Sequence, residues 1–102
     1  MFNREDLHAK FEEILGSTNV YFQPPSSIQM KYPAIVYTRS GINNTFANNS
    51  VYSQVPAYEV TVIDKSPESE IVLKISQLPK CKWDRHFTLD NFNHDVFTLY
   101  HF

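Results

Sequence analysis

The sequence has little of several residue types, and each shortage excludes a class of function. It has one cysteine, Cys81, so the chain cannot form an internal disulfide, which fits a reducing compartment. Its two glycines, Gly16 and Gly41, cannot build a glycine-rich loop that cradles phosphate. No apolar run approaches the ~20 residues of a membrane-spanning helix. The first residues do not form a signal peptide, so we expect neither membrane insertion nor secretion by that route.

Charge is also sparse, whereas aromatic residues are abundant. A formal net charge of −2, without any run of lysine or arginine, gives no electrostatic footprint for sequence-specific nucleic-acid binding. The 102 residues have enough hydrophobic content, 42%, to form one domain spanning 1–102. Eight phenylalanines, six tyrosines and one tryptophan exceed what one small core usually holds. We therefore expect part of the aromatic surface to contact a partner.

The stretch from residue 58 to residue 78 predicts a strand, a turn and a helix. Residues 58–64 alternate with β-branched side chains on both faces, which is typical of a central strand. Ser66 is the expected N-cap and Pro67 the expected first helical residue. The helix carries a core-facing apolar stripe through Ile75, and Pro79 ends it.

The rest of the chain predicts shorter elements of both kinds. A second helix is expected at the beginning of the chain, and hydrophobic alternation predicts the other strands. We expect a helix at 3–15, strands at 18–23 and 34–39, one helical turn at 26–31, and strands at 80–89 and 92–102 joined at Asp90-Asn91. The predicted fold is α+β, with a mostly antiparallel sheet of four to five strands and two helices packed on one face.

Residues 40–57 read as a long loop, because four asparagines fall between residues 40 and 50. Ile42, Phe46 and Tyr52 are apolar residues within this polar stretch, where a mobile loop has no need of them. We therefore predict that the loop is mobile in the isolated chain and becomes ordered against a neighbouring subunit or another partner on assembly.

Catalytic and metal-binding patterns are missing. The four histidines do not have metal-ligand spacing, and Cys81 has no nearby base. We assign no catalytic, cofactor-binding or metal-binding residue and expect no enzyme activity. His94 and Asp95 lie in a cluster, 90–95, that a structured turn explains; they would serve the alternative of a small cytoplasmic enzyme or ligand-binding domain.

Asp84 and Arg85 form an adjacent pair of opposite charges next to Trp83. We expect an ion pair, made either locally or between subunits. At a protein surface such a pair contributes at most about 1 kcal/mol. Trp83 is expected in the core or at an interface.

Five sequence words in a fixed order resemble a family of small tail-completion, or tail-terminator, proteins of long-tailed bacteriophages. The ordered set carries the resemblance, which covers nearly the whole chain. The words are Asn-Val-Tyr-Phe-Gln-Pro-Pro at 19–25, Tyr-Pro-Ala-Ile-Val-Tyr at 32–37, Tyr-x-Val-Thr-Val-Ile-Asp at 58–64, Asp-Arg at 84–85 and Asp-Asn-x-Asn-His-Asp at 90–95.

This resemblance implies a small α+β domain that forms a ring, commonly a hexamer, on the end of the tail tube. The ring would stop tube polymerisation and dock the head connector or stopper protein, and DNA would pass non-specifically through its bore. It implies a virion protein assembled in the bacterial host cytoplasm, without cofactor or membrane. The alternative in the same class is a head-completion protein. The expected interface residues are Ile42, Phe46, Tyr52, Asp84, Arg85, His94 and Asp95.

Overall fold

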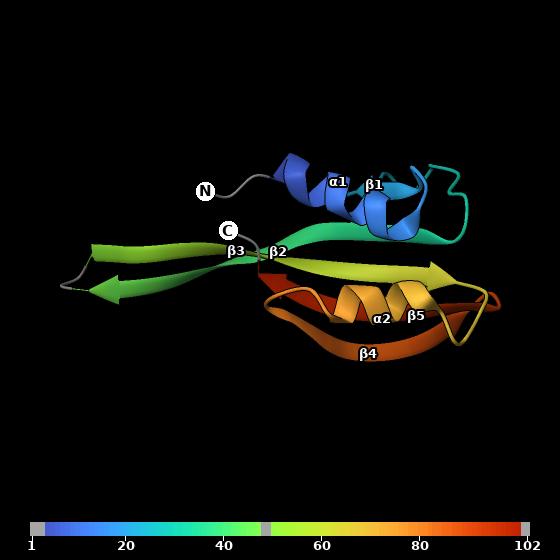
Figure 1. The fold of residues 1–102 in the computed structure, drawn as a ribbon. Coiled ribbons are helices and arrows are strands. Elements are labelled where there is room, and N and C mark those ends of the chain that lie inside the picture. Colours follow the sequence, from blue (N-terminus) through green and yellow to red (C-terminus); the bar gives the residue numbers. More distant parts are fainter. Residues whose placement is uncertain (1–3, 48–49, 101–102) are drawn as a thin grey trace.

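The computed structural model describes residues 4–47 and 50–100, with the backbone alone for 42–47 and 50–55. Five strands form one sheet in the order β1-β2-β3-β5-β4, in which only β1 and β2 run parallel (Figure 1). This confirms the predicted α+β class. The elements are α1 (Arg4–Leu15), β1 (Val20–Phe22), β2 (Ala34–Ala47), β3 (Ser50–Asp64), α2 (Glu70–Ser76), β4 (Cys81–Leu89) and β5 (Phe92–Tyr100).

The β3 strand lies at the centre of the sheet, as the alternation of residues 58–64 predicted. Val60 lies opposite Tyr37 of β2 on one side and Phe97 of β5 on the other. All three side chains are fully buried. A strand with partners on both edges and hydrophobic residues on both faces is held by the ladder and by the core together.

The core gathers side chains from both helices and four strands. Burying one aliphatic or aromatic side chain of this kind contributes about 1.5–3 kcal/mol, so the cluster is the main source of stability. Its buried members are Leu7 and Phe11 of α1, Ile75 of α2, and Val20, Ile35, Tyr37, Tyr58, Val60, Val62, Phe97 and Leu99 of the strands.

Tyr37 ties α1 to the sheet. Its ring meets the Phe11 ring edge-on, with centroids 5.1 Å apart. Its hydroxyl lies 3.2 Å from Nη1 of Arg4, which donates to it, and 2.7 Å from Nδ1 of His8. Burial raises the pKa of Tyr37, and the Arg4 hydrogen bond opposes that rise. The buried hydroxyl is therefore a neutral structural group with partners on α1.

The α2 helix begins three residues later than the sequence predicted. Ser69 is its N-cap, and the Ser69 hydroxyl accepts a hydrogen bond of 3.2 Å from the Ile71 amide. The prediction of Ser66 as N-cap and Pro67 as first helical residue is wrong. The Asp64 carboxylate accepts from the Ser66 amide at 3.1 Å and holds that serine in a turn before the helix.

Two smaller features also bear on the predictions. The expected helical turn at 26–31 is wrong: residues 26 and 27 form a turn, closed by a hydrogen bond from the Ile28 amide to the Pro25 carbonyl, and 28–31 have no regular structure. The turn at Asp90 and Asn91 is confirmed, because both residues have positive φ, 52° and 68°. Asparagine and aspartate tolerate that conformation, which a two-residue hairpin requires.

No helix among the described residues is both long enough and apolar enough to cross a membrane.

The largest departure from the sequence prediction is in the expected loop, 40–57, where residues 40–47 and 50–57 belong to strands. The β2 strand continues to Ala47, β3 begins at Ser50, and the two pair in antiparallel register up to that end. Figure 1 shows them leaving the body as a two-stranded projection, and the molecule measures 50 × 24 × 23 Å. We call residues 41–47 and 50–57 the arm. Its Ile, Thr, Phe, Val and Tyr residues favour strands, and this preference prevails over the asparagine content.

Candidate assembly surfaces

The arm begins where the described parts of the neighbouring strands stop. On one side, the described part of β5 pairs with β3 as far as Tyr100, which lies opposite Ala57. On the other side, β1 pairs with β2 only along residues 35–37. Within the described residues the arm strands pair only with each other beyond these points. Both outer edges of the arm thus present backbone N–H and C=O groups on which another strand could pair, and a two-stranded ribbon is marginally stable alone.

The edge of β4 differs from the edges of the arm in its charged residues and in the regularity of its pairing. The β4 edge carries Lys82, Asp84 and Arg85, with a register shift between Trp83 and Arg85. Charges and bulges are devices that prevent a sheet edge from pairing with another chain. Residues 40–57, in contrast, contain no Asp, Glu, Lys, Arg or His. The arm therefore lacks the charged side chains that discourage edge-to-edge association.

The register of the arm separates apolar pairs from polar ones. Ile42 lies opposite Pro56 near the body, and Phe46 lies opposite Val51 near the tip. Tyr52 lies at the register shift beside that second pair. These backbone positions place the three predicted interface residues of this segment on the arm, while their side chains lie outside the described part. Between the two apolar pairs stand Asn43 with Val55, Asn44 with Gln54 and Thr45 with Ser53.

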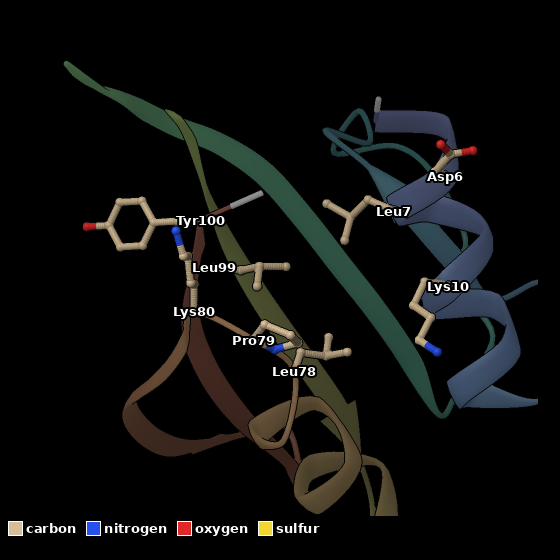
Figure 2. Close-up of a pocket in the computed structure, with 8 residues that line it drawn as sticks. All are labelled: Asp6, Leu7, Lys10, Leu78, Pro79, Lys80, Leu99 and Tyr100. Atoms are coloured by element: carbon tan, nitrogen blue, oxygen red, sulfur yellow. The ribbon is translucent and has the colours of Figure 1, made fainter. Parts of the chain in front are cut away.

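A cleft opens between α1 and residues 78–80, the connection from α2 to β4. Its volume is about 410 Å³, and Figure 2 shows the side chains of Leu7, Leu78 and Leu99 pointing toward one another across it. Leu7 and Leu99 are each 3% exposed and form an apolar floor. The full lining is Asp6, Leu7, Lys10, Leu78, Pro79, Lys80, Leu99 and Tyr100.

The position of this cleft links it to the arm. The Tyr100 amide donates to the Lys80 carbonyl at 3.1 Å, which closes the cleft at the end of β5. Because Tyr100 also pairs with Ala57, the cleft lies at the end of the body from which the arm leaves. Sequence patterns did not indicate this cleft, because its floor residues belong to the expected hydrophobic stripes and the gap between them leaves no trace in the sequence.

The predicted ion pair between Asp84 and Arg85 is not formed within the chain: no salt bridge joins these two described residues. The register shift at Asp84 explains why, because the Asp84 carboxylate accepts a hydrogen bond from the Thr98 hydroxyl while Arg85 lies opposite Val96. An ion pair of either residue with another subunit stays a prediction.

His94 and Asp95 do not form a common site. Successive strand residues point to opposite faces of the sheet. The His94 ring stacks on Phe87, with centroids 4.7 Å apart and planes at 14°. Oδ1 of Asp95 accepts from the indole nitrogen of Trp83 at 3.2 Å. Each side chain therefore has its own partner on β4 and supports the β4–β5 hairpin.

Among the described residues, no group of three or more His, Cys, Asp or Glu side chains could hold a metal ion. Burial and, secondarily, the charge of Asp84 raise the pKa of Cys81 to about 11, so the thiol is a weak nucleophile near neutral pH.

The chain matches no protein-family model, no curated protein and no solved structure. A function for it is therefore inferred from its residues and geometry. Two features stand out for that purpose: the uncharged arm with open edges, and the apolar cleft beside the arm's base.

Proposed function

We propose that this chain is a structural subunit of a bacteriophage tail, which forms a ring, commonly six-fold, on the end of the tail tube. The ring ends polymerisation of the tube and offers the docking surface for the head connector. The single observation that carries the proposal is the arm, a two-stranded extension of the central strands that has no charged residue and whose outer edges pair with no strand of the described residues. Such an element is suited to pairing with another chain.

A second surface supports the proposal from the opposite end of the body. The arm leaves beside Tyr100, at one end of β5, and the turn to β4 lies at the other end (Figure 1). Near that turn Phe87 and Leu89 of β4 are 39% and 56% exposed. A protein that joins two structures needs two separate partner surfaces, and exposed aromatic and aliphatic side chains are typical of such surfaces.

The charge of the chain agrees with passage of DNA through a ring. A strongly basic bore would hold DNA through phosphate contacts and counterion release. The net charge of −2 and the absence of basic runs do not provide such a grip. We therefore expect DNA to pass the ring without sequence-specific contacts. The subunit would reside in the virion after assembly in the bacterial cytoplasm.

The same surfaces would serve a head-completion protein on the other side of the joint, so that assignment is kept as the alternative within the class. In a different class, the cleft between α1 and the 78–80 connection could hold a small apolar ligand, since pockets of ~300–1,000 Å³ commonly do. An isolated ligand-binding domain would have no need of the arm.

Native mass spectrometry of the purified chain, alone and with isolated tail tubes or head connectors, tests the proposal. We expect rings of a single size, in solution or on tube ends, and no rings on connectors in the absence of tubes. Binding to connectors but not to tubes would select the head-completion alternative. A chain that stays monomeric with both partners would contradict the proposal.

A further inference from the structure

We propose that the cleft between α1 and the 78–80 connection receives the tip of the arm from a second copy of the chain. The inference rests on the proposed function, because it names the contact through which neighbouring subunits of a ring would join. Arm tip and cleft are two different surfaces, so their contact is head-to-tail. Repetition of such a contact around an axis generates a closed ring when the rotation between copies permits closure.

The length of the arm prevents its tip from reaching the cleft of its own chain, so the cleft that receives the tip belongs to another copy. From Ala57 to Val51 the β3 strand rises ~3.3 Å per residue, so the apolar pair near the tip lies roughly 20 Å from the body. An arm of this length cannot place its tip in the cleft beside its own base while its ladder stays paired. The arm extends along the 50 Å axis of the molecule (Figure 1), so its tip lies beyond the body of its own chain.

The chemistry of the tip matches that of the cleft. The register places Phe46 opposite Val51 next to the last described pair of the arm, Ala47 with Ser50, and the pairs between there and the base are mainly polar. Leu7, Leu78 and Leu99 face one another across the cleft and offer apolar contact (Figure 2). Transfer of an aromatic or aliphatic side chain from water into such surroundings favours association. Because the arm has no charged side chain, docking would not require a charged group of the arm to lose its hydration.

Disulfide trapping between two differently tagged chains tests the contact. Both chains carry Cys81→Ala; one also carries Ala47→Cys at the arm tip and the other Lys10→Cys at the cleft. Ala47 follows Phe46, so both apolar tip residues are kept. In the matched control, Leu73→Cys replaces Lys10→Cys, because Leu73 is 63% exposed and lies outside the cleft. We expect the mixed, oxidised sample to give a cross-linked heterodimer at about tenfold the control yield, the ratio for a preference of ~1.4 kcal/mol.

Rings that form with a cross-link no stronger than the control would overturn this inference and leave the proposed function standing. Failure to associate with tubes at all would overturn both.

A second pair of variants tests the cleft and leaves the arm unchanged. Pro79→Asp places a carboxylate at the cleft, whereas Pro67→Asp makes the same change at an exposed proline elsewhere. We expect only Pro79→Asp to weaken association, by about tenfold or more. Equal association of the two variants would contradict the docking.

Phe102 of the same chain is the competing occupant, since it follows Tyr100 by two positions. Phe46→Ser and Phe102→Ser distinguish the two. If the arm tip fills the cleft of a second copy, Phe46→Ser weakens association about tenfold or more while the monomer keeps its melting temperature. If Phe102→Ser lowers the melting temperature of the monomer and Phe46→Ser leaves association unchanged, the cleft belongs to the chain's own end and the inference is wrong.

Discussion

Ala57 lies directly opposite Tyr100, and this pair marks the boundary between the five-stranded body and the two-stranded arm. Beyond it, within the described residues, β3 pairs only with β2. The arm is thus a continuation of the two central strands and not a separate loop. A force applied at the arm would act directly on the strands that hold Val60 and Tyr37 in the core.

The core position of α2 gives the first prediction. Ile75 is fully buried, so Ile75→Asp places a carboxylate among apolar side chains and costs several kcal/mol. We expect loss of the native circular dichroism spectrum. Leu73→Asp is the matched control on the same helix, because Leu73 is mostly exposed, and its effect is expected within about 0.5 kcal/mol. A folded Ile75→Asp variant would show that α2 does not pack as described.

The buried tyrosines give a pH dependence. Burial raises the pKa of both Tyr37 and Tyr58 above the ordinary value of 10.0. The neutral phenols are therefore favoured in the folded state, and this stability is complete below pH 10 and is lost as the pH rises through the folded pKa values. We expect Tyr37→Phe to lower stability at pH 7 by about 1 kcal/mol through the lost hydrogen bonds.

The same substitution should make the alkaline loss of stability less steep, because it removes one of the groups whose pKa the fold raises. Urea unfolding midpoints at pH 7, 10 and 11 provide the measurement, with Tyr58 and Cys81 contributing to the slope that remains. An identical slope in the wild type and in Tyr37→Phe would contradict the assignment.

Cys81 should react slowly with alkylating reagents. Burial and the neighbouring Asp84 charge raise its pKa from 9.0 to about 11, so the thiolate fraction at pH 8 falls by roughly a hundredfold. We expect the rate of iodoacetamide labelling, followed by mass spectrometry, to rise as the pH approaches 11. Asp84→Asn should speed labelling, since it removes one cause of the shift. Equal rates for the native chain and the urea-unfolded chain at pH 8 would refute the prediction.

His94→Ala tests the proposal that the chain has no catalytic or metal site at 90–95. The ring stacks on Phe87, and loss of such a pair costs about 0.5–1.5 kcal/mol beyond the area buried. We expect a folded variant and no saturable Zn²⁺ binding by either form in isothermal titration calorimetry. Saturable binding by the wild type that disappears in the variant would favour the enzyme or ligand-binding alternative.

The sequence predicted the parts of the fold that have strong local patterns. Alternation identified the central strand at 58–64, and the Asp90-Asn91 pair identified the hairpin turn, because both signals arise from neighbouring residues. The start of α2 was misplaced because Ser66 and Ser69 are both suitable N-caps, and the Asp64 turn decides between them.

The arm and the cleft could not be predicted for a different reason. A strand beside a core shows alternation because one face is buried, and residues 41–47 have no body beneath them to impose it. Asparagine-rich composition then favoured a loop. The cleft depends on how α1 approaches the 78–80 connection, which is a relation between distant segments that no local pattern records.

The most direct test of the account is the length of tail tubes grown with and without the arm. An arm-shortened variant, in which an Asn-Gly turn replaces residues 44–54, keeps the body strands and joins the paired residues Asn43 and Val55 by a two-residue hairpin. We expect it to fold as a monomer with the wild-type circular dichroism spectrum. Added to polymerising tube protein, the wild type should halt growth at a uniform length in electron micrographs, and the shortened variant should not. Equal capping by both proteins, or no effect of the wild type on tube length, would contradict the account.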